Sequence, residues 1–317
     1  MKKDRMNRFI GVVMVMLLFA SCGGGDSFNG ERVVLTKHHF FTSENEGVNF
    51  YIQATDRNKR GIVGLTNEDF SINENGISLL LADSRLEVKT DSDLGFKMRV
   101  VVLIDNGSSA ESNLSEVKTS VNSFIDGLVS DKVEIAIYTF SLGTQRVIDF
   151  TTDKEALKRA VDGIRLGNHS TDLFGAVVKS SSLLQDSYSD NIVEQGVLLV
   201  YTDGRENRGN TTLTELKEAI KDKRIYTIGY TGGDIDSEQL QMIGSAGFFK
   251  ARTNMEISEK FDFAKNEIAN YAGSFYWLKY RSPKVNDKEN TVELTINNSN
   301  KFRRVNTIEA KFHGFEE

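Results

Sequence analysis

The strongest constraint on the fold is a nearly continuous apolar run at residues 98–104 that ends directly at Asp105. Such a run is typical of a strand that is buried on both faces of a parallel sheet. Helix-like and strand-like segments then alternate along the chain, at residues 114–129, 133–140, 154–164, 173–184, 197–201, 213–221, 225–228, 237–243, 248–250 and 257–271. This alternation predicts a doubly wound, mostly parallel α/β sheet in a domain spanning residues 96–273.

Both flanks of this domain have a β pattern instead. Short runs rich in β-branched and aromatic residues, separated by Asn, Asp and Gly turns, occur before it at residues 33–35, 48–52, 70–72 and 79–81. Similar runs follow it at residues 274–280, 291–296 and 305–312. Our hypothesis is that segments 31–95 and 274–317 pair into one smaller all-β sandwich, with the α/β domain inserted between them.

The first residues of the chain have the pattern of an export signal. Four basic residues precede an apolar run at residues 9–20, which is too short to cross a bilayer core that needs about 20 apolar residues. The run leads into Cys22, the only cysteine, and residues 17–22 resemble a bacterial lipobox. The resemblance implies a signal peptide at 1–21, cleavage before Cys22, lipidation of its thiol and a flexible tether at 22–30. The alternatives are an uncleaved anchor helix and an ordinary free cysteine.

Charge and cysteine content limit the partners. The formal net charge is −6, and removal of residues 1–21, which hold four basic residues and one acidic residue, lowers it to −9. Nucleic acid and anionic lipid headgroups are therefore not expected partners. The expected location is the cell envelope through a membrane anchor at Cys22, and Gly23 after the cysteine, where some bacteria use Asp to retain lipoproteins, favours the outer over the inner membrane.

Oxygen-bearing side chains follow three strand-like runs of the α/β domain. They occur in Asp105-Asn106-Gly107-Ser108-Ser109, in Thr171-Asp172 and in Thr202-Asp203-Gly204. Ligands of open α/β sheets bind beyond the carboxyl ends of the strands, where these three segments are expected to meet. In order and separation they resemble the metal-ion-dependent adhesion site of a von Willebrand factor A (vWA) domain, and the resemblance covers about residues 97–273. Residues 64–76 similarly resemble the β-sandwich segment that precedes this domain in bacterial secreted proteins.

The resemblance implies a divalent cation, Mg²⁺ or Mn²⁺, held by oxygen ligands. The implied ligands are Asp105, Ser109, Thr171 and Asp203. Gly107 stands where the family has a serine, so water, or Ser108 if the loop turns differently, would take that place. The remaining coordination position would accept a carboxylate from a protein partner, and the expected partner-binding rim consists of Asn106, His169, Asp172 and Arg205.

Three functions follow as alternatives. The first is a lipid-anchored envelope protein that binds a protein partner through this cation. The second is a metal-independent scaffold lipoprotein, because the Gly107 substitution is also what a degenerate site would carry, and the oxygen residues would then only cap helices and turns. The third, a metal-dependent hydrolase, has the least support: Gly107 occupies the position of a general acid, and the sequence has no Gly-x-Ser-x-Gly elbow and no phosphate-binding loop. We therefore expect a non-enzyme without a small-molecule substrate.

Overall fold

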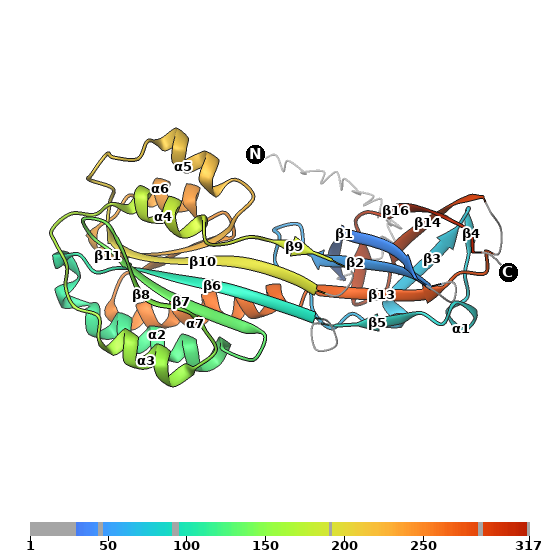
Figure 1. Cartoon of the computed structure of the whole chain (residues 1–317), viewed down its shortest axis with the longest axis horizontal. Coiled ribbons are helices and arrows are strands. Elements are labelled where there is room, and N and C mark those ends of the chain that lie inside the picture. The colour runs from blue at the N-terminus through green and yellow to red at the C-terminus, as the bar shows by residue number, and fades with distance from the viewer. Residues whose placement is uncertain (1–29, 44–46, 91–94, 190–191, 285–287, 316–317) are drawn as a thin grey trace, which may run out of the picture.

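The computed structural model describes residues 30–43, 47–90, 95–189, 192–284 and 288–315. The expected signal peptide and the lipidation site at Cys22 lie outside these residues. Within the described part of the chain, no helix is both long enough and apolar enough to cross a bilayer. The molecule is elongated, with an α/β domain at one end and a β-sandwich at the other (Figure 1).

The α/β domain is built on a seven-stranded sheet with the order β12-β11-β10-β6-β7-β8, and β9 pairs with β10 outside this path. Its strands are β6 (Gly95–Asp105), β7 (Val133–Phe140), β8 (Thr144–Thr151), β9 (Ser187–Tyr188), β10 (Ile192–Gly204), β11 (Arg224–Asp234) and β12 (Gly247–Ala251). Five of these strands are parallel neighbours, whereas β8 and β9 pair antiparallel. The predicted class, a mostly parallel α/β sheet with additional antiparallel β-sheets, is confirmed.

Helices cover both faces of this sheet. They are α2 (Leu114–Leu128), α3 (Lys154–Asp162), α4 (Leu173–Ser181), α5 (Leu213–Ile220), α6 (Ser237–Ile243) and α7 (Asn254–Ala272), and a short 3-10 turn, η2 (Ser108–Ser112), precedes α2. Val100 and Val102 of β6 pack in the core on the face of α2, α3 and α7, whereas Val101 and Leu103 pack in the core on the face of α4, α5 and α6. Successive strand residues point to opposite faces, so a strand covered on both sides needs an unbroken apolar run.

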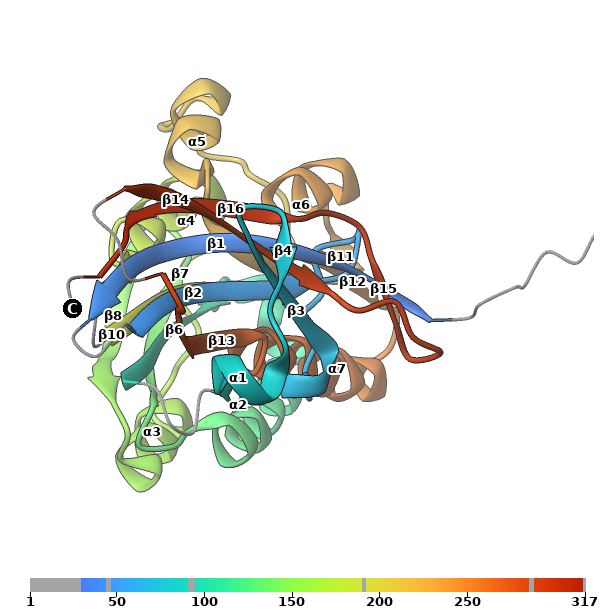
Figure 2. The same cartoon turned by 90° about the vertical axis from the view of Figure 1, so that its right-hand side faces the viewer.

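The remaining strands form two facing sheets. One sheet has the order β15-β1-β2-β13-β5, and the other has the order β16-β14-β3-β4 (Figure 2). These strands are β1 (Glu31–Ser43), β2 (Gly47–Thr55), β3 (Phe70–Glu74), β4 (Ile77–Ser78), β5 (Glu87–Lys89), β13 (Phe275–Arg281), β14 (Glu289–Ile296), β15 (Phe302–Arg304) and β16 (Ile308–His313). Strand β13 pairs with β2 and β5, and β14 pairs with β3, so chain segments from both sides of the α/β domain share each sheet.

Two short elements complete the sandwich, η1 (Asn67–Asp69) and α1 (Leu81–Ser84). The expected strand at residues 79–81 is wrong, because β4 ends at Ser78 and the chain then turns into α1. Leu79 packs against the sandwich core, but Leu80 is 70% exposed.

The two parts share apolar packing where they meet. Tyr51 of β2 and Phe275 of β13 belong to the core that also covers one face of the α/β sheet. Helix α7 continues through Gly273 into β13, and the ring of Phe275 lies 5.6 Å from that of Phe96 and 5.3 Å from that of Tyr271. The carboxyl ends of β6 and β10 lie at the opposite end of the α/β domain, away from the sandwich (Figure 1).

Candidate functional site

The two carboxylates predicted to form a site lie at the ends of adjacent strands. Asp105 is the last residue of β6, and Asp203 is the penultimate residue of β10. The register pairs Ile104 with Tyr201, so the two strands reach this edge of the sheet together. Asp105 is fully buried and Asp203 is 1% exposed. Two carboxylates are therefore held close together where bulk water cannot solvate both of them.

Asp105 is held by two hydrogen bonds. Its Oδ1 accepts from the backbone N–H of Gly107 at 2.9 Å, and its Oδ2 accepts from the Thr202 hydroxyl at 2.6 Å. The pKa of Asp105 is raised to about 7, because burial and, to a smaller extent, the charge of Asp203 outweigh the two hydrogen bonds, which lower it. A cation bound here would favour the ionised form, because it would supply the positive charge that the site lacks.

Asp203 is held by side chains from the segment that follows β6. Its Oδ1 accepts from Ser109 Oγ at 3.0 Å, and its Oδ2 accepts from Asn113 Nδ2 at 3.1 Å. Asn113 precedes α2 and is 1% exposed. Ser109 is exposed, so this hydroxyl lies between a buried carboxylate and solvent.

Thr171 reaches the site from the loop before α4. It is 5% exposed, and Asn207 fixes its backbone from both sides: Asn207 Oδ1 accepts from Thr171 N–H at 2.8 Å, and Asn207 N–H donates to the Thr171 carbonyl at 3.1 Å. A Cβ atom built on Gly204 would lie only 2.9 Å from Thr171 Oγ1 and 3.6 Å from Asp105 Oδ2. The glycine of the Thr-Asp-Gly turn therefore lets this hydroxyl approach the carboxylates.

Gly107 lies among these oxygen-bearing residues but supplies no side-chain oxygen. Its φ of −52° is accessible to any residue, so its backbone conformation does not require glycine. A Cβ atom at this residue would lie 3.1 Å from Asp105 Oδ1 and 3.6 Å from Ser109 Oγ. Ser108 does not replace it, because its hydroxyl is hydrogen-bonded to Nδ1 of the exposed His169 ring instead.

The residues of the expected rim differ in exposure. Asn106 is 9% exposed, and its Nδ2 donates to the Arg165 carbonyl at 2.8 Å, so this side chain links the loop after β6 to the loop after α3. His169 and Arg205 are exposed, and Arg205 forms a bidentate ion pair with Asp234, with N–O distances of 2.6 and 2.7 Å.

Asp172 is half-buried beside Glu206. Burial, followed by the charge of Glu206, raises the pKa of Asp172. Glu206 itself accepts hydrogen bonds from the backbone N–H groups of Phe174, Arg208 and Gly209 at 2.7 to 2.9 Å, so it links the start of α4 to the loop after β10.

Four supporting residues were not singled out from the sequence: Thr202, Asn113, Asn207 and Glu206. Thr202 lies inside the Thr-Asp-Gly segment, so the motif carried a signal for it. Asn113 and Asn207 have no local signal, because the bonds to Asp203 and Thr171 form only through the fold, and the same holds for the bond between Glu206 and Phe174.

The donor set fits a hard divalent cation. Two carboxylates and two hydroxyls converge on the same edge of the sheet, and oxygen ligands of this kind suit Mg²⁺ and Mn²⁺. Among the described residues no group of three or more His, Cys, Asp or Glu side chains could hold a metal, so any metal bound here would rely on the hydroxyls of Ser109 and Thr171 as well as the carboxylates. Asp105, Asp203, Ser109 and Thr171 would hold the ion, which would supply a positive centre for an anionic group of a partner.

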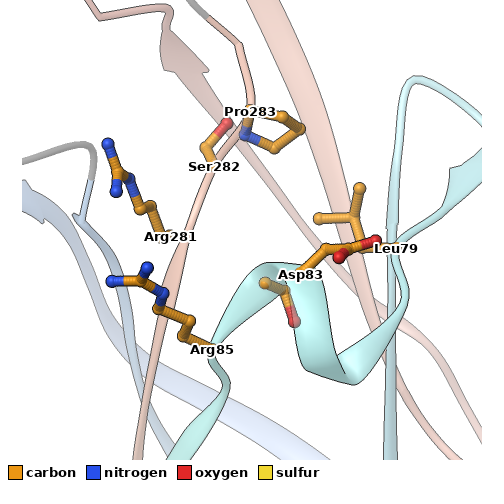
Figure 3. Close-up of a pocket in the computed structure, with 7 residues that line it drawn as sticks. Leu79, Asp83, Arg85, Arg281, Ser282 and Pro283 are labelled. Carbon is orange, nitrogen blue, oxygen red and sulfur yellow. The ribbon is translucent and has the colours of Figure 1, made fainter.

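A separate cavity of 330 Å³ lies at the far end of the sandwich (Figure 3). It is lined by Leu79, Asp83, Ser84, Arg85, Arg281, Ser282 and Pro283. These residues come from the α1 region and the end of β13, so this cavity is unconnected to the carboxylates at the ends of β6 and β10.

The fold and the site thus define a class of protein: a doubly wound α/β domain with oxygen-bearing side chains at the carboxyl ends of its strands. The sequence matches the von Willebrand factor type A domain family over residues 100–265, which is just over half of the chain. The chain belongs to this family. A search of curated proteins found no match.

Solved structures with a similar fold include three from different sources. A von Willebrand factor type A protein from Catenulispora acidiphila is 12% identical, with 91% of this chain and 75% of that chain covered and a TM-score of 0.48. The vWF domain of the type V pili tip protein Mfa5 from Porphyromonas gingivalis is 14% identical, with 56% and 96% covered and a TM-score of 0.44. Proximal thread matrix protein 1 from the mussel byssus, in a structure with a zinc-occupied MIDAS motif, is 17% identical, with 61% and 50% covered and a TM-score of 0.47. This chain therefore spans about half the length of the mussel protein.

Proposed function

We propose that this protein is a lipid-anchored component of the cell envelope that binds a protein partner through its vWA domain. In this proposal a divalent cation, Mg²⁺ or Mn²⁺, is held by Asp105, Ser109, Thr171 and Asp203 and bridges to a carboxylate of the partner. The observation that carries the proposal is the convergence of these four oxygen-bearing side chains at the strand ends that face away from the sandwich. The proposed activity is binding without catalysis, and the proposed location is the outer membrane.

One observation favours a second candidate. Gly107 provides no oxygen where a serine Cβ would lie 3.1 Å from Asp105 Oδ1, so the site has one fewer protein ligand than its relatives' motif. A scaffold lipoprotein that keeps the fold and binds its partner without metal is the alternative.

Metal-dependent thermal unfolding separates the two candidates. The chain beginning at residue 22, with Cys22→Ser, keeps every described residue and is compared in chelator and in millimolar Mg²⁺ or Mn²⁺. Metal at 100 times its Kd would stabilise the native state by about 2.7 kcal/mol, which raises the Tm by roughly 4–5 °C for a protein of this size. Asp203→Ala should abolish this increment, whereas Asp131→Ala at an exposed turn should keep it. An equal Tm with and without metal in the unsubstituted protein would support the metal-free scaffold.

The anchor has a test of its own. Incorporation of labelled palmitate into the full chain in a bacterial host should occur in the wild type and be lost in Cys22→Ala. Retention of the label in the variant would contradict lipidation at this residue, and fractionation of the same cells would test the outer-membrane assignment.

A further inference from the structure

The chain is acidic, but the surface around the start of β1 is basic. Residues 31–34, 55–60, 221–224 and 301–304 hold ten Lys or Arg residues and three Asp or Glu residues, in a protein whose formal net charge is −6. These segments are far apart in the sequence. Their positive charge is therefore concentrated only if the fold brings them together.

Backbone contacts bring all four segments to one place. Strand β1 begins at Glu31, whose N–H donates to the Lys301 carbonyl at 2.9 Å, and the adjacent register pairs Arg32 with Arg303. On the other side of β1, Val34 pairs with Thr55, which leads into the loop at 56–60. An Arg224 guanidinium nitrogen then donates to the carbonyl of Lys59 in that loop at 3.1 Å.

A groove of 500 Å³ runs between the sandwich and the vWA domain at this place. Basic side chains from both parts line it or lie at its end, and we call this surface the tether face: Arg32, Arg57, Lys59, Lys223, Arg224 and Arg303. Arg32 lies on the same side of β1 as the lining residues Val34 and Thr36, because alternate strand residues share a face.

The carboxylates in the groove do not balance these cations. Asp56 forms a salt bridge with Arg60 at 2.9 Å, and it also accepts from two backbone N–H groups of its own loop. Asp186 accepts from the backbone N–H of Gly196 at 2.9 Å, and its charge interacts with both Lys223 and Arg224, so one carboxylate faces two of the cations. Asp222 remains as the third acidic residue of the groove.

The position of this face matches the position of the proposed anchor. Only seven residues separate Cys22 from Gly30, the first described residue, so even a fully extended link of eight steps spans at most roughly 28 Å. The tether face also lies at the start of β11. The proposed metal ligands Asp105 and Asp203 lie at the opposite ends of the parallel strands, where β6 and β10 finish. A lipid at Cys22 would hold the basic face near the bilayer with the metal site at the far edge.

We propose that the tether face binds anionic phospholipid headgroups and thereby orients the anchored protein with its metal site away from the membrane. Basic residues close to an anionic bilayer are attracted to it within a Debye length, even when the protein as a whole is acidic. The orientation rests on the proposed lipid anchor. The affinity of the face for headgroups does not, so the two can fail separately.

Vesicle sedimentation tests the face without the anchor. The Cys22→Ser chain from residue 22 is mixed with vesicles of phosphatidylcholine alone or with about a third phosphatidylglycerol, at low salt. Binding should be strong only with the anionic vesicles and should be lost at 0.5 M salt, where the Debye length is roughly 4 Å. Arg32→Glu combined with Arg57→Glu should weaken it at least tenfold. The matched control is Arg159→Glu with Arg252→Glu, which makes the same charge change at exposed positions of α3 and of the segment before α7.

Three results would overturn the proposal. The first is equal binding to neutral and anionic vesicles, and the second is an equal loss in the two double variants. The third is binding to an acidic polypeptide such as polyglutamate with no binding to anionic vesicles, which would identify the groove as a protein-binding site instead. Circular dichroism spectra of both double variants that match the parent spectrum would show that charge, and not folding, has changed.

Discussion

At the scale of single residues, Gly107 is the position at which the proposed metal site lacks a side-chain oxygen. Gly107 lies between Asp105 and Ser109, and its backbone conformation is open to any residue. Serine there would place a hydroxyl beside oxygen atoms that already converge. The glycine is therefore a local change in the ligand set and not a requirement of the loop.

Gly107→Ser should strengthen metal binding. The added hydroxyl would supply the ligand that water must otherwise provide, although Asp105 has to shift by a few tenths of an ångström, because the new Cβ would lie 3.1 Å from its Oδ1. Isothermal titration with Mn²⁺ should show a lower Kd than in the wild type. Gly143→Ser is the control, since a Cβ there meets no atom within 4 Å. Unchanged or weaker metal affinity in Gly107→Ser would mean that position 107 is not a ligand position.

Asn113→Ala should weaken metal binding without removing a proposed ligand. Asn113 positions Asp203 through a 3.1 Å hydrogen bond, and loss of residues that orient metal ligands typically costs 10–100-fold in affinity. The same titration with Asn122→Ala serves as the control, because Asn122 of α2 bonds to Asp162 at 3.0 Å, away from the site. Equal affinities in the two variants would contradict a positioning role for Asn113.

The sequence predicted the four proposed ligands but not the residues that hold them. Asp105 and Asp203 each follow an apolar strand, so their meeting at one end of the sheet follows from the parallel topology, whereas Thr171, in the loop between α3 and α4, was predicted from the vWA resemblance. Asn113 and Asn207 have no such mark, because their partners lie 90 and 36 positions away along the chain. Likewise, only the fold reveals that the Asn106 side chain donates to the Arg165 carbonyl.

At the scale of elements, strands buried on both faces were the most predictable part. Strand β6 was predictable because helices cover both of its faces, and burial on both faces requires an unbroken apolar run. Strand β8 was not predicted, since it lies at the edge of the sheet, has exposed and half-buried residues without regular alternation and pairs antiparallel with β7. The strand expected at residues 79–81 is wrong in the opposite sense, because this apolar run lies where β4 has ended and the chain turns into α1.

Glu206 connects two elements, and its removal should loosen both. Its carboxylate accepts from the first turn of α4 and from two N–H groups of the loop after β10. Hydrogen bonds to a charged group contribute about 1.5–3 kcal/mol each to stability, but solvent exposure of part of this loop reduces their sum, so Glu206→Ala should lower the free energy of unfolding by about 2 kcal/mol. Urea unfolding measures this loss. Glu218→Ala, at an exposed position of α5, should change the same quantity by less than about 0.5 kcal/mol.

At the scale of the whole molecule, the junction between the sandwich and the vWA domain should respond to pH. His38 of β1 stacks on Tyr188 of β9 with ring centroids 4.3 Å apart, and burial lowers its pKa to about 4 from 6.5. Because the folded pKa is below the unfolded one, the native state favours neutral His38. Its contribution to stability is complete above about pH 6.5 and is lost as the pH falls towards 4.

His38→Phe should remove this part of the pH dependence. Phenylalanine can still stack on Tyr188 but carries no titratable group. Between pH 7 and pH 4.5 the wild type should lose about 2 kcal/mol more unfolding free energy than the variant, an order-of-magnitude value that allows for the partial exposure of the ring. Urea unfolding at both pH values measures the difference. The same substitution at exposed His313 should leave the wild-type pH dependence intact, and identical losses in wild type and His38→Phe would show that the junction does not sense protonation of this ring.

The long strands β6 and β10 carry Asp105 and Asp203 at one end and begin near the sandwich at the other (Figure 1). Tension between a partner on the metal and an anchored N-terminus would run along these strands, which are paired over ten consecutive positions from Gly95 to Ile104. Such a load acts as shear on all the ladder hydrogen bonds at once, whereas a hairpin pulled from its open end breaks them one at a time. A protein that links a membrane to another surface would resist unfolding under force better with this arrangement, without any added covalent cross-link.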